Sequence, residues 1–441
     1  QEQTDKLLEV KGKLPLLERI IVIDVRGLRH YDDEKIIGIT EVEELGRKID
    51  DKDPDRFYQL VAETQADDVA MLIYTSGTTG PPKGCMISHR NHITNINGIN
   101  DILHLTEKDS VVSYLPLCHI LERSISMAIA LVCGYTVNFA ESIDTVQQNI
   151  HEISPTFFAA VPRILEKMHS TVQIKLQDTT HFKHLMSRLF LPVGKRVTKY
   201  RMAKHSIPIF WLLVYGLAYL FVLRPIREKI GLLKCRLLMS GGAPIAPEIL
   251  QFYHSLGVFA IEMWAQTESC GGGTGPHGEV KPGSVGQPIS TIELKLAEDG
   301  EILIGHKTAF AGYYRNAEAT KEVLTNGWLH TGDIGRFDED GHLYIIDRKK
   351  DIIITSGGKN LSPSEIENNI KCSLYIKEAI VFGDGRKFLS ALIQIEYDNV
   401  GKWAQNNKIP YTNYKSLAIS SEVQKLIGQE LDEINQTMAR V

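Results

Sequence analysis

A loop of glycines, hydroxyl side chains and one lysine is the strongest chemical signal in the chain. It spans Tyr74–Gly84 (Y-T-S-G-T-T-G-P-P-K-G) and directly follows the apolar run Val69–Ile73. Glycines let a backbone approach a ligand closely, hydroxyls and amides donate hydrogen bonds, and a lysine neutralises negative charge, so the loop predicts a polyphosphate site. Lys83 follows two prolines and precedes Gly84 rather than Ser or Thr, so the pattern is not that of a Walker-type hydrolase. The alternative is a flexible surface loop.

Two further groups of residues have types suited to a nucleotide. Ser240–Pro244 (S-G-G-A-P) is a turn of small residues at the end of an expected strand, where open α/β sheets bind ligands. About twenty residues later, Trp264 offers a face for stacking on adenine, Thr267 a hydroxyl for a phosphate oxygen, and Glu268 a carboxylate for Mg²⁺. On its own, this second group is equally typical of a strand end with a solvated Thr-Glu pair.

Two segments further along carry charged side chains after turns. Asp333 closes the segment Trp328–Asp333 and is suited to accept hydrogen bonds from both hydroxyls of a ribose. The run Asp347–Asp351 (D-R-K-K-D) places Arg348 and Lys350 near an expected domain connector. A charge run is usually a solvated face, so we interpret it as an exposed connector whose basic residues matter because of the motifs before them.

Short apolar runs alternate with helical-looking sequence and predict the elements that position these residues. The expected strands of the first part are Arg19–Asp24, Met71–Tyr74, Val111–Leu115, Thr156–Val161 and Arg236–Ser240, and Pro247–His254 is an expected helix. This alternation predicts an α/β fold with largely parallel sheets. After Pro288 the β-type runs become shorter, as in Glu301–Ile304 and His342–Ile346.

The bulk composition bounds the class of protein. A chain of 441 residues exceeds what one hydrophobic core usually organises, so we expect two or more domains. The net charge of −5 lacks the basic excess of a nucleic-acid binder, so no nucleic acid is expected as a partner. The six cysteines are scattered without a C-x-x-C pair, which is typical of reduced cytoplasmic thiols rather than of disulfides or a zinc site.

One apolar segment suggests contact with a membrane. Ile207–Leu223 (IPIFWLLVYGLAYLFVL) contains no charged residue and has lysines and arginines on both sides. Its 17 residues are at the lower limit for spanning a bilayer, and Pro208 and Gly216 weaken it as a regular transmembrane helix. Basic flanks around Trp and Tyr suit a helix lying in the headgroup region of a membrane surface. The alternative is a buried helix capped by solvated basic residues.

Five motifs in their order make the chain resemble the adenylate-forming superfamily. Tyr74–Gly84 resembles the phosphate loop of that family, Ser240–Pro244 its adenine turn, and Trp264–Glu268 its aromatic-x-x-Thr-Glu motif. Thr331–Asp333 resembles the motif of its ribose aspartate, and Arg348 its second ribose contact. The resemblance runs from about Ile20 to about Ile395.

Two more segments make the chain most similar to long-chain fatty acid–CoA ligases of the bubblegum-like and bacterial branches. They are Leu115–Ile120, followed by Glu122 and Arg123, and Val161–Lys167. The resemblance implies that a fatty acid carboxylate attacks the α-phosphorus of ATP in the presence of Mg²⁺, which gives acyl-adenylate and pyrophosphate. The thiol of coenzyme A then displaces AMP. The implied location is the cytoplasm, peripheral on a membrane if residues 207–223 lie on its surface.

The resemblance also implies a role for each matched residue. The β- and γ-phosphates would be held by Thr75, Ser76, Thr78, Thr79 and Lys83, and Gly77 and Gly80 of the same loop would also bind ATP or AMP. The rest of ATP or AMP would be held by Gly242, Ala243, Pro244, Glu262, Trp264, Gln266, Thr267, Asp333 and Arg348. Coenzyme A would be approached by Ser356, Gly357 and Lys359.

Four residues would have catalytic roles under the same resemblance. Glu268 would bind Mg²⁺, Thr267 would hold the α-phosphate, and Lys350 would lie at the hinge on which a small domain rotates between half-reactions. His119 would gate the path between adenylate and thiol and respond to phosphate charge, since imidazole titrates near neutrality. A structural histidine is the alternative for His119.

The implied domains are a large multi-sheet adenylating domain over residues 1–346, with an apolar helical insert at about 180–230, and a small α+β lid domain over residues 347–441. Only 73 residues precede Tyr74, so we expect the first strands of the large domain to be missing. Nothing after Tyr397 matches the loop that carries the family's catalytic lysine, so we expect either a fragment of a longer synthetase or a shortened relative. Two other functions stay open: a ligase that loads a carrier protein, and a non-catalytic nucleotide- or acyl-binding protein on a membrane.

Overall fold

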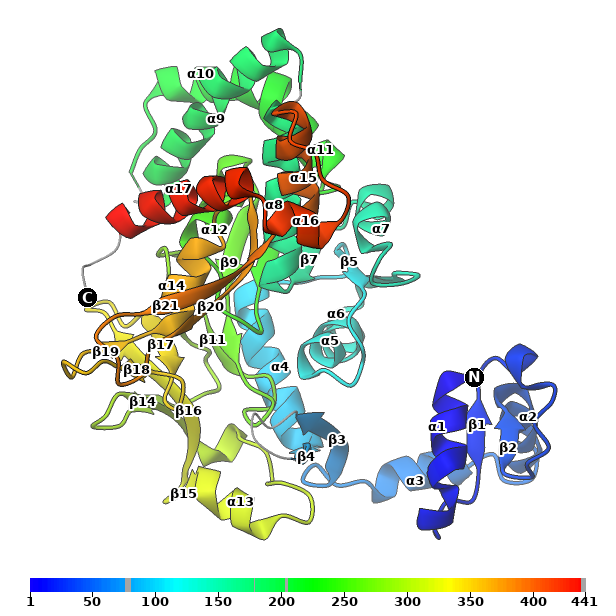
Figure 1. Ribbon diagram of the computed structural model, residues 1–441. Coiled ribbons are helices and arrows are strands. Elements are labelled where there is room, and N and C mark those ends of the chain that lie inside the picture. Colours follow the sequence, from blue (N-terminus) through cyan, green and yellow to red (C-terminus); the bar gives the residue numbers. More distant parts are fainter. Residues whose placement is uncertain (76–80, 178, 203–204, 438–441) are drawn as a thin grey trace. The chain divides into compact units, whose positions relative to one another are not determined.

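The computed structural model describes residues 1–75, 81–177, 179–202 and 205–437. The chain divides into two compact units, Gln1–Asp68 and Val69–Val441. Helices and strands alternate in both units (Figure 1), so the expected α/β class is confirmed.

The first unit contains a pair of parallel strands between helices. Ile20 pairs with Ile36, and Ile20 and Leu28 are buried. The expected strand Arg19–Asp24 is therefore confirmed in its central residues. The elements of this unit are α1 (Glu2–Val10), β1 (Ile20–Val22), β2 (Ile36–Gly38), α2 (Ile39–Asp50) and α3 (Arg56–Glu63), with short 3₁₀ turns at Lys11–Lys13 and Arg26–Leu28.

The second unit is built around a parallel sheet of three strands. Its strands are β7 (Phe157–Ala160), β8 (Leu237–Ser240) and β9 (Phe259–Glu262), in that order. All four residues of β8 are buried, as a continuous apolar run predicts for a strand covered on both faces. The helices α8 (Pro162–Gln177) and α12 (Pro247–Ser255) lie next to this sheet (Figure 1). Their apolar side chains share one core with it. The carboxyl ends of β8 and β9 lead into the predicted nucleotide motifs.

Further elements of this region extend this core through Val112 and Ile150 and form a second one around Ile96, Ile120 and Ile129. Strands β5 (Ser110–Ser113) and β6 (Thr136–Phe139) form a second parallel pair. The connecting helices are α4 (His89–Leu103), α5 (Ile120–Arg123), a π-helix at Ser124–Ile129, α6 (Ala130–Cys133) and α7 (Val146–Ile153).

The prediction of largely parallel sheets is wrong for the rest of the described chain. Strands β3 (Val69–Thr75) and β4 (Lys83–Ser88) form an antiparallel hairpin, because a short loop lets the chain return directly beside itself. All sheets after β9 are antiparallel as well. Their strands are β10 (Trp264–Ala265), β11 (Gly273–Gly275), β12 (Gln287–Pro288), β13 (Leu294–Leu296), β14 (Glu301–Gly305), β15 (Leu324–Thr325), β16 (Trp328–Phe337), β17 (Leu343–Arg348), β18 (Ile353–Ile354), β19 (Asn360–Leu361), β20 (Ile376–Phe382) and β21 (Ser390–Ile395).

The C-terminal part has a core of its own around Ile353, Val400, Leu417 and Val423. Its helices are α14 (Pro363–Ile370), α15 (Tyr397–Asn406), α16 (Tyr414–Ala418) and α17 (Ser421–Thr437), and α13 (Ala317–Val323) precedes it between β14 and β15. A separate core is what a lid domain requires, and the boundary near residue 346 stays a prediction.

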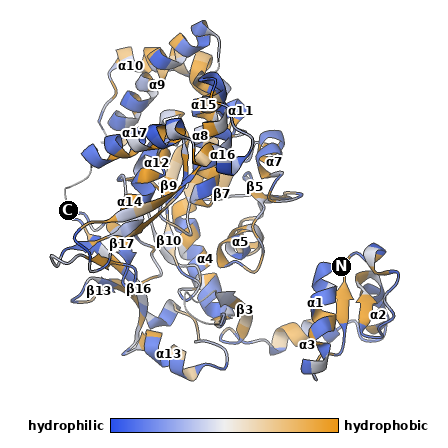
Figure 2. Cartoon of the chain, viewed as in Figure 1, coloured by the Kyte–Doolittle hydropathy of each residue, from blue (hydrophilic) through white to orange (hydrophobic). Residues whose placement is uncertain are grey.

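The apolar segment near residues 207–223 is helical and largely exposed. It comprises α10 (Ile209–Ala218) and a π-helical turn at Tyr219–Leu223, followed by α11 (Arg224–Lys229) and preceded by α9 (His181–Met202). Among the described residues, Ile209–Lys229 is one helix long and apolar enough to cross a membrane, and 22% of its most apolar window is buried. Ile209, Phe210 and Leu213 of α10 are exposed, whereas Ala218 and Leu223 pack in the core. Hydrophobic residues colour much of α10 (Figure 2), and in the described chain this helix is not buried on all sides as the alternative required.

Candidate active site

The two ends of the predicted phosphate loop are held together by the β3–β4 hairpin. Thr75 pairs with Lys83 and Tyr74 with Gly84. Lys83 and Gly84 thus lie in the returning strand rather than in the loop, which corrects the sequence-based boundary. A Cβ at Gly84 would lie 3.1 Å from the ring of Tyr74, so glycine permits this close pairing. The loop residues Ser76, Gly77, Thr78, Thr79 and Gly80 lie outside the described residues.

Lys83 and Glu268 both contact the side chain of Tyr313. The Lys83 Nζ is 5.1 Å from the centroid of the Tyr313 ring, within cation–π distance. The Tyr313 hydroxyl donates a hydrogen bond of 2.8 Å to Glu268 Oε1. Burial and the charge of Glu268 raise the pKa of Tyr313 above its usual value, so the phenol stays a donor at neutral pH. The predicted phosphate lysine and the predicted metal carboxylate are therefore linked through one tyrosine.

Asp333 is the centre of a second cluster. The two donors Trp264 Nε1 and Gln266 Nε2 each lie 2.8 Å from its Oδ2, and Arg348 Nε lies 3.3 Å from its Oδ1. The pairing of Asp333 with Arg348 across β16 and β17 brings the two predicted ribose contacts together. Burial raises the pKa of Asp333, although the hydrogen bonds and the arginine charge oppose it. These contacts fix the carboxylate in one orientation.

Gln266 also joins the aromatic-x-x-Thr-Glu segment to the ribose segment, because its Nε2 donates to the Thr331 carbonyl at 2.9 Å. The neighbouring Thr267 is partly buried, and its carbonyl accepts a hydrogen bond from the Cys270 N–H at 2.9 Å. These bonds hold the backbone of the segment after the end of β10, and the role of Thr267 stays a prediction.

The D-R-K-K-D run is only partly the exposed connector that the sequence predicted. Asp347 is 5% exposed and accepts hydrogen bonds from Ser362 Oγ and from Ser364 N and Oγ, so it holds the start of α14. Lys349 pairs with Asp299 and Glu301, at 2.6 and 3.0 Å. Lys350 lies in the exposed turn directly after β17, where a hinge was predicted.

A cavity joins the small-residue turn to the predicted gate. It is lined by His119, Gly241, Gly242 and Trp264, and its other walls are mostly apolar, with one hydroxyl from Ser124. The apolar residues among them are Ile99, Ile120, Leu121, Ile125, Ile129, Met239 and Met263. An apolar cavity beside nucleotide motifs can take an acyl group.

His119 is held at this cavity by the start of α5. Its Nδ1 accepts a hydrogen bond from the Leu121 N–H at 3.2 Å, so the neutral imidazole carries its proton on Nε2. Burial lowers the pKa of His119, and the charge of Glu122 opposes this shift. Glu122 is itself buried and accepts hydrogen bonds from Ser113 Oγ at 2.6 Å and the Leu115 N–H at 3.2 Å, which fixes the loop before His119. The structural and gating interpretations of His119 are thus compatible.

Glu262, a predicted nucleotide contact, is buried next to the small-residue turn Ser240–Pro244. Gly242, Ala243 and Pro244 are exposed, whereas Glu262 is 8% exposed at the end of β9. Burial raises the pKa of Glu262 to about 8, against a hydrogen bond from the backbone of Ile245. Its contact with a nucleotide stays a prediction.

The segment predicted to approach coenzyme A forms the exposed tip of the β18–β19 hairpin. Thr355 Oγ1 accepts a hydrogen bond from the Lys359 N–H at 3.1 Å, and the Ser356 N–H donates to the Arg386 carbonyl at 2.9 Å. Ser356, Gly357 and Lys359 are all exposed. The side chains are accessible to a phosphate, and their role stays a prediction.

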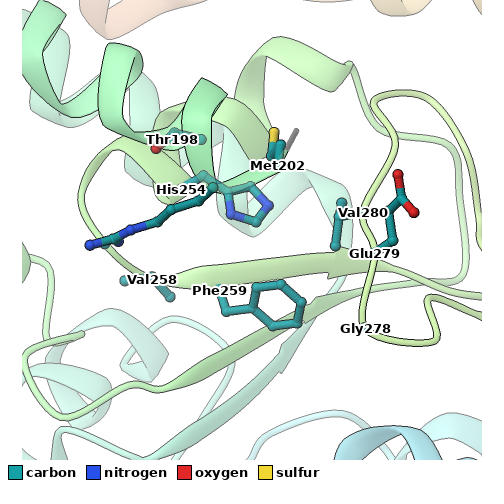
Figure 3. A pocket seen from close by; sticks show the side chains of 10 residues that line it. Thr198, Met202, His254, Val258, Phe259, Gly278, Glu279 and Val280 are labelled. Carbon is teal, nitrogen blue, oxygen red and sulfur yellow. The ribbon is translucent and has the colours of Figure 1, made fainter. Parts of the chain in front are cut away.

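A second cavity lies at the opposite end of β9, away from these motifs (Figure 3). It is lined by residues of α9, α12 and the loop around Val280, with His254, Thr198 and Met202 among them. Burial lowers the pKa of His254 to about 4, so this imidazole is neutral at physiological pH.

Magnesium fits the cluster around Glu268 only with ligands supplied by a substrate. Among the described residues, no group of three or more His, Cys, Asp or Glu side chains could hold a metal ion. Mg²⁺ bound to nucleotides commonly takes one or two protein carboxylates and completes its shell with phosphate oxygens and water. A single carboxylate near the phosphate lysine suits that arrangement.

Comparison with protein families agrees with this geometry. The model of the AMP-binding enzyme family matches residues 1–314, and that of the AMP-binding enzyme C-terminal domain matches residues 350–413. The chain belongs to the AMP-binding enzyme family. The resemblance inferred from the five motifs is confirmed at the level of the family.

Two curated relatives have names that indicate their activity. The long-chain-fatty-acid–CoA ligase FadD15 of Mycobacterium tuberculosis is 33% identical over 415 residues, which cover 90% of this chain and 64% of the relative. The long-chain-fatty-acid–CoA ligase ACSBG2 of Xenopus laevis is 33% identical over 422 residues, which cover 90% of this chain and 54% of the relative. The AMP-binding chain thus spans less than two thirds of these relatives.

Solved structures share the fold. An anthranilate CoA ligase in complex with anthranoyl-AMP aligns with a TM-score of 0.68 at 21% identity, over 100% of this chain and 71% of that chain. An O-succinylbenzoate coenzyme A synthetase of Bacillus subtilis, in complex with ATP and magnesium ion, aligns with a TM-score of 0.55 at 26% identity, over 80% of this chain and 66% of that chain. Both likenesses support an adenylating-enzyme fold.

Tyr313, which contacts the predicted residues Glu268 and Lys83, and Glu122, which holds the loop before His119, were not among the predicted site residues. Tyr313 follows Phe310-Ala311-Gly312, a segment without an obvious ligand-binding pattern, and its position beside Glu268 depends on the tertiary fold. Glu122 was noted only as part of the resemblance.

Proposed function

We propose that this protein activates a long-chain fatty acid with ATP to an acyl-adenylate and then transfers the acyl group to coenzyme A. The observation that carries the proposal is the convergence of Asp333, Arg348 and Trp264 beside an apolar cavity that reaches His119. Curated relatives named long-chain-fatty-acid–CoA ligases support the same reaction.

Each residue cluster supplies a separate part of the chemistry. Asp333 accepts from the ribose hydroxyls, Arg348 stabilises Asp333 as a carboxylate, and Lys83 neutralises charge on the β- and γ-phosphates. The apolar cavity holds the start of the acyl chain and excludes water from the adenylate, which would otherwise be hydrolysed. Mg²⁺, when bound at Glu268, would neutralise charge on the phosphates.

The second half-reaction requires access of the thiol to the adenylate. His119 lies at the cavity wall with its Nδ1 engaged, so its Nε2 edge can change position only with α5. We propose that the turn after β17, at Lys350, lets the C-terminal domain rotate so that Ser356, Gly357 and Lys359 approach coenzyme A.

The proposal includes a cytoplasmic location with peripheral attachment to a membrane. The exposed hydrophobic side chains of α9, α10 and the π-helical turn are Phe182, Leu185, Leu189, Ile209, Phe210, Leu212, Leu213, Leu217, Leu220 and Phe221. The segment 181–229 that carries them contains five lysines and five arginines against one glutamate, in a chain with a net charge of −5. Apolar side chains among cationic ones suit an anionic lipid surface, from which fatty acids can be taken.

Pyrophosphate release with a series of fatty acids tests the adenylation step, and formation of the CoA thioester tests the second step. The Glu268→Gln variant keeps the shape of the side chain and removes its charge, so we expect it to lose adenylation by about a hundredfold while its unfolding curve stays unchanged. Release of pyrophosphate without CoA thioester would instead favour transfer to a carrier protein. No pyrophosphate release by the wild-type protein with any carboxylate would refute the ligase proposal.

A further inference from the structure

Tyr313 connects the two charged groups that the proposed reaction needs near the phosphates. Its hydroxyl donates to Glu268 Oε1 at 2.8 Å, and its ring lies 5.1 Å from Lys83 Nζ. The side chain is 6% exposed, and its ring makes an edge contact with Phe310 at 4.8 Å. The ring and the hydroxyl of one buried side chain therefore contact a cation and an anion at once.

The backbone around Tyr313 is fixed to both partners. The Tyr314 N–H donates to the Gly84 carbonyl at 2.7 Å and the Ala311 N–H to the Met86 carbonyl at 2.8 Å, which ties this segment to β4 next to Lys83. The Phe310 N–H donates to the carbonyl of Glu268 itself at 2.8 Å. These bonds hold the tyrosine at a set position relative to Lys83 and Glu268.

The arrangement solves an electrostatic problem of such a site. A carboxylate and an ammonium group on neighbouring segments attract each other, and a direct ion pair would reduce the charge that each offers to a metal or a phosphate. The aromatic face attracts the ammonium group while the phenol donates to the carboxylate. The Glu268 carboxylate also takes part in a hydrogen bond with the thiol of Cys85. A carboxylate has about four acceptor positions on its two oxygens, so these two bonds leave acceptor capacity for a metal ion.

We propose that Tyr313 is a positioning residue that holds Glu268 for Mg²⁺ and Lys83 for the phosphates of ATP. This inference rests on the proposed function, because it assigns the cluster to magnesium–ATP. Tyr313 acts through Glu268 and Lys83 and does not itself need to touch the reacting atoms.

The test is a Mg²⁺ titration of ATP binding by the full chain, measured by calorimetry or by a fluorescent ATP analogue, without any turnover. The Tyr313→Phe variant keeps the ring and loses the hydroxyl, so we expect the Mg²⁺ midpoint to rise about tenfold, as for the loss of one hydrogen bond to a charged group. Binding of ATP in EDTA should change less than twofold. The matched control is Tyr314→Phe, since Tyr314 is the next residue and 41% exposed, and both quantities should stay at their wild-type values.

A second variant tests the contact between the Tyr313 ring and Lys83. Tyr313→Leu removes the aromatic face as well, so it should weaken ATP binding in EDTA in addition to raising the Mg²⁺ midpoint, because Lys83 loses its support. Equal losses in Tyr313→Phe with and without Mg²⁺, or an unchanged Mg²⁺ midpoint in that variant, would show that Tyr313 is merely structural. If the wild-type chain binds ATP without any dependence on Mg²⁺, the proposed function fails. If Glu268→Gln loses that dependence and Tyr313→Phe keeps it, only the positioning role fails.

Discussion

Replacing Asp333 by asparagine should separate ribose recognition from folding. The carboxylate has two oxygens, and in the structure Oδ2 accepts from Trp264 and Gln266 while Oδ1 faces Arg348 at 3.3 Å. Asparagine has nearly the same shape but only one acceptor oxygen. It can accept hydrogen bonds at the position of one carboxylate oxygen and presents an NH₂ group at the position of the other. One of the two ribose hydroxyls then has no acceptor at this residue.

The expected magnitude follows from the kind of bond that is lost. A hydrogen bond to a charged group contributes about 1.5–3 kcal/mol, which corresponds to roughly 10- to 150-fold weaker binding of ATP or AMP. The variant should also be less stable by roughly 1–3 kcal/mol. Asp333 is buried, and in the variant an N–H donor of Trp264, Gln266 or Arg348 would face an NH₂ group that cannot accept its hydrogen bond.

The assay compares ATP with 2′,3′-dideoxy-ATP by equilibrium binding to both proteins. The wild-type protein should prefer ATP by at least tenfold, and Asp333→Asn should reduce that preference by about tenfold or more. Asp340→Asn is the matched control, since the Asp340 side chain is 71% exposed in the turn between β16 and β17. Equal preference for ATP in wild type and Asp333→Asn, with both proteins folded, would refute ribose recognition by Asp333.

Three further predictions concern the pH dependence of stability and the membrane. Burial raises the pKa of Glu262 to about 8, so the native state keeps a proton that the unfolded state releases, and stability should fall as the pH rises from about 5 to about 8. In urea unfolding, Glu262→Gln should therefore be more stable than wild type by a few kcal/mol at pH 8 and about as stable as wild type at pH 5. The same difference in stability at both pH values would contradict the raised pKa of Glu262. Burial alone would raise the pKa of Asp109, but hydrogen bonds from Arg236 and Thr156 outweigh it and lower the pKa to about 2. The Asp109→Asn variant should therefore lose roughly 2 kcal/mol of unfolding free energy at pH 7, which is less than for a fully buried pair because Arg236 is partly exposed. This loss should shrink as the pH falls from 4 to 2, where the wild-type carboxylate takes up its proton. Equal losses at pH 7 and pH 2.5 would argue against this assignment. Changing both Leu213 and Leu217 to Glu should reduce sedimentation with phosphatidylglycerol vesicles at least fivefold without changing nucleotide binding, and unchanged sedimentation would exclude this face as the membrane contact.

The sequence predicted the parts of the site whose signals are local. Gly84, Asp333 and Arg348 each belong to a short motif, and the expected strands Met71–Tyr74 and His342–Ile346 before Gly84 and Arg348 are present. The expectation that Asp333 follows a turn is wrong, since Asp333 lies within β16, where it pairs with Arg348 of β17. Local signals also predicted the parallel strands, since continuous apolar runs such as Leu237–Ser240 imply burial on both faces. They could not predict the direction of strand pairing after β9, because an antiparallel sheet with short strands leaves no distinct pattern at this length.

The residues that sequence reasoning missed act across long separations. Tyr313 lies 45 residues from Glu268 along the chain, and the bond between them exists only because β4 and the segment after Phe310 lie side by side. The same holds for Trp264 and Asp333, 69 residues apart, whose separate motifs suggested separate contacts with adenine and ribose. The indole N–H is committed to Asp333, so the orientation of the Trp264 ring and that of the ribose carboxylate are set together. A substitution at either residue should therefore disturb recognition of both parts of the nucleoside, which two independent motifs would not require.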